Sequence, residues 1–397
     1  MNRACLAIWV CLAGFSGAGC AGEQSAGEAA GVVRDSAGIR IVDLSGAPSP
    51  SMRALEVDGA WLKEFNLEVG QLADVVPLPG GGAVLLDELS GTISVLDRAG
   101  QRLLEFGRLG EGPGEFSPHG GVSWVLVTDS SLVIPDNQLQ RMTEFSLEGE
   151  VLKIDPMPGS GADGGLVIGV DWRAHPDGGI VFRALSSTGD RILWSHEGVV
   201  ETLHAFEVPD PTSSDLLPPV ALWDVGVTAE LVLGRSDRGR IEKRIPGDVS
   251  PLWVARWEDE RAELTARDRA HLEELLLTSS EAGWTGSLPA EERDRILRSV
   301  ALPDSVPVIA SVLADRMGRT WIQGATPVTE MGLDALSTWS ATGFGGTEWR
   351  VLGPDGFLEE VVTLPRGFTP RRFWEDCIVG VLADELGVQR PARVCVR

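Results

Sequence analysis

Positive charge is scarce in this sequence. Its 397 residues include 34 Lys and Arg against 58 Asp and Glu, which gives a formal net charge of -24. A phosphate backbone repels a protein of this charge, so the composition argues against nucleic-acid binding. Anionic lipid repels it for the same reason, so flat adsorption on a membrane surface is also disfavoured.

Signatures of several enzyme classes are absent as well. No Gly-Lys-Ser/Thr of a nucleotide phosphate loop occurs, and there is no Gly-x-Ser-x-Gly nucleophile elbow. The five histidines form no pair at zinc-ligand spacing, and no Ser, His and Asp set stands out. These absences favour a non-enzymatic protein, but they do not exclude catalysis. The histidines are His119, His175, His196, His204 and His271, and His119 is the one candidate acid or base.

The N-terminus has no apolar run long enough to span a bilayer. Its apolar stretch, Ala4 to Phe15, is too short for that and has the character of a signal peptide. The following Gly17-Ala18-Gly19-Cys20 resembles the lipobox of bacterial lipoproteins, although Gly17 replaces the usual Leu. That family is cleaved before the cysteine and acylated on its thiol, which implies a signal peptide over 1–19 and lipid on Cys20. Residues 20–37 then form a flexible tether. Cleavage elsewhere would instead give a free secreted protein.

Cysteine usage fits an exported protein. Two of the five cysteines leave with the signal peptide and lipid would occupy Cys20, so Cys377 and Cys395 remain as an even pair. If Glu385-Leu386-Gly387 is a three-residue hairpin loop, counting outward along the strands places these two cysteines opposite each other. Directly opposed residues are close enough for a disulfide. A loop of another length would shift the register and leave two buried thiols.

A strand-hairpin unit recurs along the rest of the chain. Three outer hairpins turn at Gly100, Gly149 and Gly356, where a short loop needs the positive φ that glycine adopts without a Cβ clash. Inner hairpins alternate with them, for example across Gly80-Gly81-Gly82. An inner and an outer hairpin make one blade of four antiparallel strands, and repetition at roughly 50 residues predicts a β-propeller.

Counting the hairpins gives an all-β, six-bladed β-propeller over residues 38–397, with five or seven blades as the alternatives. The last blade runs out of chain after three strands, and Gly38–Leu44 is the N-terminal strand predicted to close the ring. The predicted blades are Leu72–Phe106, Gly121–Ile154, Leu166–Phe206, Leu222–Val254, Val308–Leu364 and a sixth that starts near Phe373.

One segment departs from the strand pattern. Thr265 and Asp268 have the spacing of a capping box, and Leu272, Leu275 and Leu276 lie on one side of the helix that it opens. A second helix is predicted to start at Pro289, in the first turn that proline favours. We therefore expect a small helical insert at about 258–302, between the fourth and fifth blades.

Three stretches carry a family resemblance. They are Phe106–Phe116, with a Gly-x-Gly-Pro-Gly-x-Phe run, Val232–Ile241 and Val381–Val388. Together they resemble the six-bladed β-propeller lipoproteins of bacteria, which are related to NHL-repeat proteins. The resemblance covers the chain from Gly38 onward and implies the fold. It implies no single function, because ligand binders, interaction scaffolds, lactonases and lyases share this architecture.

Loops between middle strands and crossings between blades must share one face of the disc, which we call the loop face. Long loops on a rigid scaffold are where function usually lies. Four aspartates end middle strands at this face and would form an acidic ring suited to Ca²⁺. The alternative, common in the NHL-like pattern, is that each caps its own loop by accepting backbone hydrogen bonds. They are Asp87, Asp136, Asp237 and Asp384.

The crossing after the first blade is a second candidate site. Its glycine N–H groups and Arg108 could cradle an anion, but Glu111 and Glu115 lie in the same loop and favour a structural crossing. Arg235, in a middle-strand loop, and His119, beside the crossing, complete the ligand-binding candidates.

These features favour a monomeric, lipid-anchored binding or protein-interaction module of the cell envelope, periplasmic or on the outer surface. Its loop face would hold an envelope protein or a small ligand. A Ca²⁺-dependent propeller hydrolase or lyase of the lactonase type is the alternative. A structural spacer without a partner is the third interpretation.

Overall fold

The computed structural model describes residues 31–396 except 37, 47–49, 119–120, 129, 160–166, 187–188, 207–218, 249, 259–262, 283–290, 292–294, 296–305 and 333–344. The predicted signal peptide, Cys20 and His119 lie outside the described residues. So does most of the helix predicted to start at Pro289.

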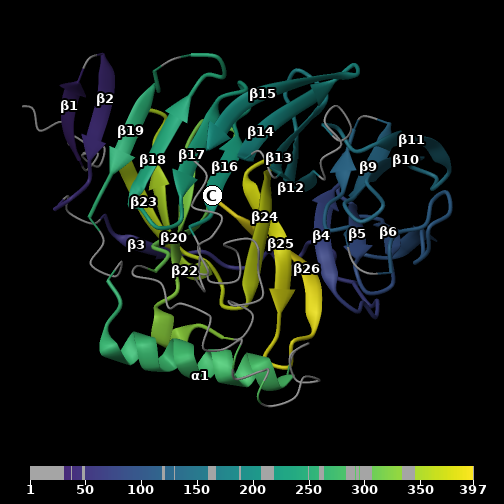
Figure 1. Cartoon of the computed structure of the whole chain (residues 1–397). Coiled ribbons are helices and arrows are strands. Elements are labelled where there is room, and N and C mark those ends of the chain that lie inside the picture. The colour runs from purple at the N-terminus through teal and green to yellow at the C-terminus, as the bar shows by residue number, and fades with distance from the viewer. Residues whose placement is uncertain are drawn as a thin grey trace, which may run out of the picture.

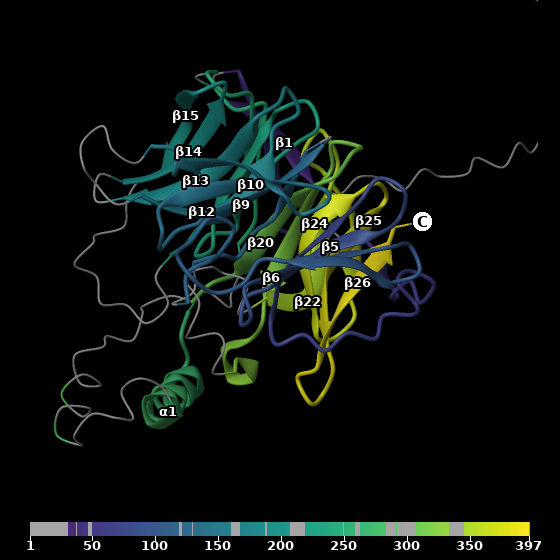
Figure 2. The ribbon, with the colours of Figure 1, turned by 90° about the vertical axis from the view of Figure 1, so that its right-hand side faces the viewer.

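Six sheets stand side by side in a ring around a central channel, which confirms the predicted propeller (Figure 1, Figure 2). Within each blade the strands follow chain order, and the first strand lies at the channel. Blade one consists of β4 (Leu72–Pro77), β5 (Ala83–Asp87), β6 (Thr92–Leu96) and β7 (Arg102–Phe106). Blade two consists of β8 (Leu126–Val127), β9 (Ser131–Asp136), β10 (Arg141–Ser146) and β11 (Val151–Pro156). Blade three consists of β12 (Ile168–Ala174), β13 (Ile180–Ser186), β14 (Gly189–His196) and β15 (Val199–Phe206).

The remaining three blades follow the same order. Blade four consists of β16 (Ala221–Val225), β17 (Leu231–Arg235), β18 (Arg240–Arg244) and β19 (Trp253–Arg256). Blade five consists of β20 (Ile309–Ala314), β21 (Thr320–Ala325), β22 (Gly345–Leu352) and β23 (Leu358–Thr363). Blade six has β24 (Phe368–Trp374), β25 (Cys377–Ala383) and β26 (Gln389–Cys395), so it begins five residues before the predicted Phe373. The innermost strands are the most buried, as in β4, and the outermost are the most exposed, as in β7.

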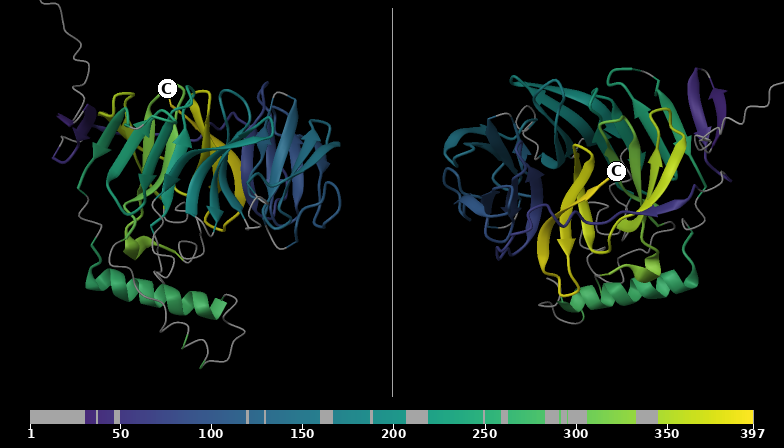
Figure 3. Two further views of the ribbon diagram at one scale, coloured as in Figure 1. Left: turned by 45° about the horizontal axis from the view of Figure 1, so that its top comes forward. Right: turned by 180° about the vertical axis from the view of Figure 1, so that it is seen from behind.

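The strand predicted to close the ring pairs elsewhere. Within Gly38–Leu44, β2 (Ile39–Asp43) pairs in parallel with β19 of blade four and antiparallel with β1 (Val32–Ser36). The chain then adds β3 (Met52–Ala54) in parallel to β23 of blade five. Only at Val57 does it reach blade six, through a bridge to Val394. The N-terminal segment therefore runs along the outer edges of three blades before entering the first (Figure 3). Local sequence could not predict this, because any open outer edge offers the same backbone groups.

The predicted disulfide is present. Cys377 and Cys395 are bonded and lie directly opposite each other on β25 and β26. Gly387 has a φ of 80°, and the N–H of Asp384 donates to the carbonyl of Val388, which is the three-residue loop that fixed the register. The disulfide joins the two ends of the last hairpin, next to the end of the chain.

The helical insert is confirmed in its first helix, α1 (Ala266–Ala282), which lies below the loop face (Figure 1, Figure 3). The capping box forms, since the N–H of Thr265 donates to the Asp268 carboxylate at 3.0 Å and the N–H of Asp268 to the Thr265 hydroxyl at 3.2 Å. Leu272 and Leu275 are buried, and α1 packs beside the short helix η3 (Val328–Glu330). In the described part of the chain, no helix has both the length and the hydropathy of a bilayer span.

A buried aspartate of blade one joins three blades at the channel. The Asp74 carboxylate, which is 0% exposed, accepts the N–H of Val75 at 2.9 Å and the N–H of Val125, in blade two, at 2.9 Å. It also forms an ion pair with Arg372 of β24. Blades six, one and two thus meet at one carboxylate, whose charge strengthens each hydrogen bond.

A second aspartate joins the other three blades. Asp224 of β16 accepts the Nε–H of Arg173, on β12, at 2.8 Å and the N–H of Ala314, on β20, at 2.7 Å. The Asp224 side chain is 7% exposed and that of Arg173 is 13% exposed. Blades three, four and five are therefore joined in the same way. We call the groups bound to Asp74 and to Asp224 the two clamps.

Removing the charge of the second clamp should destabilise the ring. We expect Asp224→Asn to lower the free energy of unfolding by up to about 3–5 kcal/mol, because Arg173 would remain buried without its ion pair. Urea denaturation of the mature protein measures this. Asp248→Asn is the matched control, since Asp248 is exposed on the turn between β18 and β19. Equal stability of the two variants would show that the clamp does not hold the blades.

Candidate functional site

The first predicted metal ligand caps a loop. The carboxylate of Asp87 accepts the N–H groups of Gly70, Gln71 and Leu89 at 2.8, 3.0 and 3.0 Å. Burial raises the pKa of Asp87, but these hydrogen bonds outweigh it and the net pKa lies below the usual value. Asp87 thus caps its loop, the alternative to binding Ca²⁺, because its carboxylate oxygens accept hydrogen bonds from the backbone.

Two further aspartates of the predicted ring do the same. Asp136 is 1% exposed and accepts backbone N–H groups from Ser117, Gln138 and Leu139 at 2.9 to 3.0 Å. Asp384 accepts the N–H groups of two residues in its own hairpin loop, each at 2.9 Å. In the described part of the chain, no group of three or more His, Cys, Asp or Glu side chains is placed to hold a metal ion. The structure therefore does not assemble Asp87, Asp136, Asp237 and Asp384 into a Ca²⁺ ring.

The glycine-rich crossing is also self-contained. Glu115 pairs with Arg108 and accepts the N–H of Gly112 at 2.8 Å, and the Gly112 hydrogen bond and Arg108 hold the pKa of Glu115 below its usual value. Arg141 of blade two donates to the carbonyl oxygens of Glu111, Gly112 and Glu115 at 2.7 to 3.0 Å. The polar groups of the loop are thus bound within the loop or by Arg141 of the next blade, in agreement with a structural crossing.

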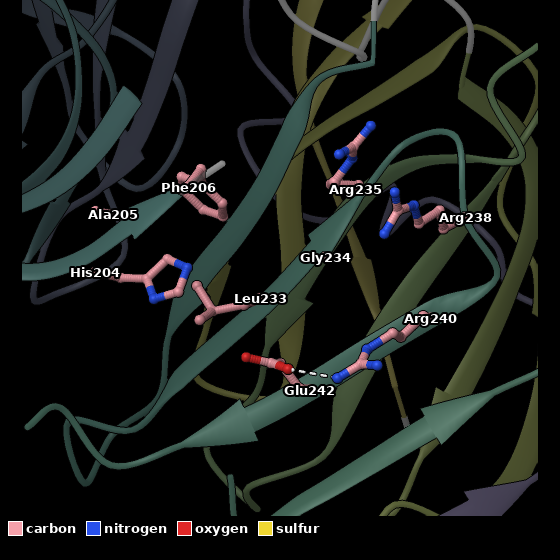
Figure 4. A pocket seen from close by; sticks show the side chains of 9 residues that line it. All are labelled: His204, Ala205, Phe206, Leu233, Gly234, Arg235, Arg238, Arg240 and Glu242. Carbon is pink, nitrogen blue, oxygen red and sulfur yellow. Dashed lines mark hydrogen bonds and ion pairs between the residues drawn. The ribbon is translucent and has the colours of Figure 1, made fainter. Parts of the chain in front are cut away.

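The remaining described candidate, Arg235, lines a cavity of about 330 Å³ between blades three and four (Figure 4). The loop between β17 and β18 borders it, so the cavity lies at the loop-face end of the groove between these blades. One wall comes from β15, and the other comes from β17, β18 and the loop that joins them. The lining residues are His204, Ala205, Phe206, Leu233, Gly234, Arg235, Arg238, Arg240 and Glu242.

Two arginines at this cavity share one carboxylate. Arg235 donates to both oxygens of Asp237 at 3.0 and 2.9 Å, the bidentate geometry that guanidinium favours. The Nε of Arg238 lies 3.9 Å from the same carboxylate, and the Arg238 side chain remains 58% exposed. One positive charge of this group is therefore not neutralised locally.

A second carboxylate at this cavity is likewise shared by two arginines. Glu242 pairs with Arg240 at 3.0 Å and with Arg244 at 2.7 Å. Each carboxylate thus serves two guanidinium groups, and three of the four, those of Arg235, Arg238 and Arg240, line the cavity. This end of the groove is a local basic site on a chain whose net charge is -24.

The rest of the cavity wall is apolar or neutral. Leu233 is 2% exposed, and Phe206 packs against the apolar cluster between the two blades. Phe206 also meets the ring of His204 edge-on, at 4.7 Å between centroids. Burial lowers the pKa of His204, as does the nearby Arg244, and this outweighs the opposing effect of Glu242 and Asp190 and favours the neutral imidazole. The cavity can therefore hold an apolar group beside an anionic one.

Comparisons with known proteins identify no family for the chain. No family model and no curated protein matches it. Among solved structures, a member of the DUF4221 family from Bacteroides vulgatus has a TM-score of 0.49 at 9% identity, over 88% of this chain and 97% of that one. A protein from Bacteroides fragilis, provisionally described as exported, has a TM-score of 0.46 at 11% identity, over 87% and 94%. Regucalcin from Agrobacterium tumefaciens, described as calcium-binding, has a TM-score of 0.43 at 12% identity, over 88% and 97%. Likeness at this level assigns no activity.

Sequence reasoning found Arg235 but missed its neighbours. Arg238 and Arg240 follow it within five residues, which is a dense cluster of arginine in an acidic chain. That density was an available signal. No sequence signal marked His204 and Phe206 as cavity residues, because they come from another blade.

The capping role of Asp87 predicts a specific pH dependence. Because its folded pKa is lowered, its carboxylate stabilises the native state above the unfolded pKa of about 3.9, and this contribution is lost as pH falls. Asp87→Asn should therefore melt below the wild type at pH 7, and the gap should close as pH approaches about 3. Thermal melts across this range test it. A gap that stays constant with pH would contradict the capping role.

Proposed function

We propose that the protein is a binding module whose ligand is a small organic anion with an apolar part. The observation that carries this proposal is that three guanidinium groups, those of Arg235, Arg238 and Arg240, line one cavity beside an apolar wall. Arginine recognises carboxylates, phosphates and sulfonates through paired N–H donors. In a chain of net charge -24, such a group is not needed for general solubility.

The size and shape of the site support an organic ligand over a bare inorganic ion. The cavity volume of about 330 Å³ falls in the range of small-molecule sites. An inorganic ion would leave the partly exposed ring of Phe206 in the cavity wall without a partner in the ligand. The neutral imidazole of His204 can donate or accept one further hydrogen bond. No comparable observation favours a hydrolase or lyase.

We also propose that the module is exported and lipid-anchored through Cys20. The apolar stretch before Gly17-Ala18-Gly19-Cys20 supports this, and the disulfide between Cys377 and Cys395 is consistent with an oxidising compartment. An anchor followed by the small, polar residues 21–31 would hold the propeller at a membrane surface that its charge does not favour.

Binding can be tested with a fluorescent amphipathic anion. We expect 1-anilinonaphthalene-8-sulfonate to bind the mature protein more tightly than its uncharged analogue N-phenyl-1-naphthylamine. Arg238→Gln removes one of the positive charges and should weaken the sulfonate by about fivefold, as expected for a partly exposed charge pair. The variant Arg238→Gln/Arg240→Gln should weaken it further and leave the uncharged analogue unaffected.

Arg316→Gln is the matched control, because Arg316 is exposed on the turn between β20 and β21, on the opposite face. It should bind both probes as the wild type does. Equal affinity of the wild type for the two probes, or an unchanged sulfonate affinity in the double variant, would refute the proposed ligand class.

The anchor is tested separately. Wild-type protein expressed in a bacterium should partition into the detergent phase on cloud-point separation, whereas Cys20→Ser should move to the aqueous phase, since the thiol that carries the lipid is gone. Mass spectrometry of the mature N-terminus identifies the acyl groups. A wild-type protein found in the aqueous phase, cleaved at another residue, would refute the anchor and leave the binding site untouched.

A further inference from the structure

The innermost strands share an irregularity at the channel. In β4 and β20 the register shifts after the first residue of the strand, Leu72 and Ile309, and in β12 and β24 it shifts after the third, Val170 and Pro370. A β-bulge adds a residue to one strand and turns side chains away from their regular alternation. Repeated in four blades, the bulges change which side chains face the channel.

The bulge of β24 places two consecutive arginines at the channel. Arg372 is bound in the first clamp, through Asp74. Arg371 is the extra residue of the bulge and forms no ion pair with any described residue, and its buried Nε has no hydrogen-bond acceptor among them. Burial lowers the pKa of Arg371, although Asp74, Asp171 and Glu88 oppose this. The guanidinium is thus a partly buried charge without a direct partner, an arrangement that costs free energy.

The bulge of β12 leaves an opposite charge in the same situation. Asp171 has a φ of 55°, in the left-handed region that few non-glycine residues adopt. Its carboxylate accepts no hydrogen bond from the described residues, whereas its neighbour Arg173 is held by Asp224. Strain of this kind persists where the surrounding structure imposes it, and it gathers at functional sites.

Both charges line one cavity of about 50 Å³ in the channel. Trp124 and Trp223 form part of its wall, and the guanidinium of Arg173 lies 5.2 Å from the ring centroid of Trp124 and 5.8 Å from that of Trp223. Arg173 is therefore occupied on its faces by rings and at its edge by Asp224. This leaves Arg371 and Asp171 as the two charges in the cavity that remain available to a ligand.

We propose that this channel cavity is a second binding site, for a small zwitterion of the size of glycine. Its carboxylate would pair with Arg371, and its ammonium group with Asp171. At about 10–15 Å³ per water-sized position, a cavity of 50 Å³ has room for roughly four such positions, which matches a molecule of a few heavy atoms. A ligand with one charge of each sign satisfies both side chains without adding net charge to the channel.

Calorimetric titration and thermal melting of the mature protein test this site with glycine, acetate and methylammonium. We expect saturable binding of glycine and weaker binding of acetate. Methylammonium chloride should have no effect beyond that of sodium chloride. Arg371→Gln should weaken both carboxylates at least tenfold. Asp171→Asn should weaken glycine alone, and asparagine tolerates the left-handed conformation, so the backbone is not the cause.

The ligand-free variants separate a binding role from a structural one. If Arg371 serves a ligand, Arg371→Gln removes a partly buried charge that has no direct ion pair and should melt at or above the wild-type temperature without glycine, whereas Arg372→Gln should melt below it. Arg316→Gln should match the wild type in every assay. The proposal is overturned if the wild type binds neither carboxylate saturably, if Arg371→Gln binds as the wild type does, or if it destabilises the ligand-free protein as much as Arg372→Gln. None of these outcomes bears on the cavity between blades three and four.

Discussion

The ring depends on two carboxylates in the channel, Asp74 and Asp224, each of which holds three blades. A carboxylate has about four acceptor positions, so it can serve donors from several blades where a neutral side chain could not. The clamps leave two seams, between blades two and three and between blades five and six. At the first, the Asn137 amide exchanges two hydrogen bonds of 2.8 Å with the backbone of Gly169. The second is crossed at the rim by the N-terminal segment, which pairs with β23 and then with Val394.

Sequence reasoning reached those parts of the fold that are encoded locally. The hairpin turns, the capping box at Thr265 and the register between Cys377 and Cys395 each follow from residues within about twenty positions of one another. The closing strand was assigned to the wrong blade because its partners lie about 200 to 340 residues away and present generic strand edges. The clamps were not predicted for the same reason, since the sequence around an aspartate in an apolar strand does not indicate which blades supply its hydrogen-bond donors.

The aspartates illustrate why a residue type at a recurring position does not define a site. Asp87 and Asp136 end their strands, Asp384 directly follows β25, and all three accept backbone N–H groups. Asp237, two residues beyond the end of β17, pairs with Arg235 instead. The difference comes from the neighbours: three of the loops present free N–H groups to the carboxylate, and the fourth presents a guanidinium. Only the last arrangement leaves positive charge at the surface, because Arg238 shares the same carboxylate. The sequence contained these arginines, but their number relative to nearby carboxylates is a property of the fold.

The acidic composition constrains how any anion could be bound. Charges separated by more than about 8–10 Å are largely screened at physiological salt, so the overall negative charge opposes approach but contributes little inside a cavity. Recognition must therefore come from guanidinium groups within contact distance, held where water is partly excluded and each hydrogen bond is stronger. Both candidate sites have this form: one between blades, where Arg238 and Arg240 border an apolar wall, and one in the channel, where a bulge turns Arg371 inward. The bulge of β24 at the axis and the β17–β18 loop at the rim thus each bring a guanidinium to the wall of a cavity.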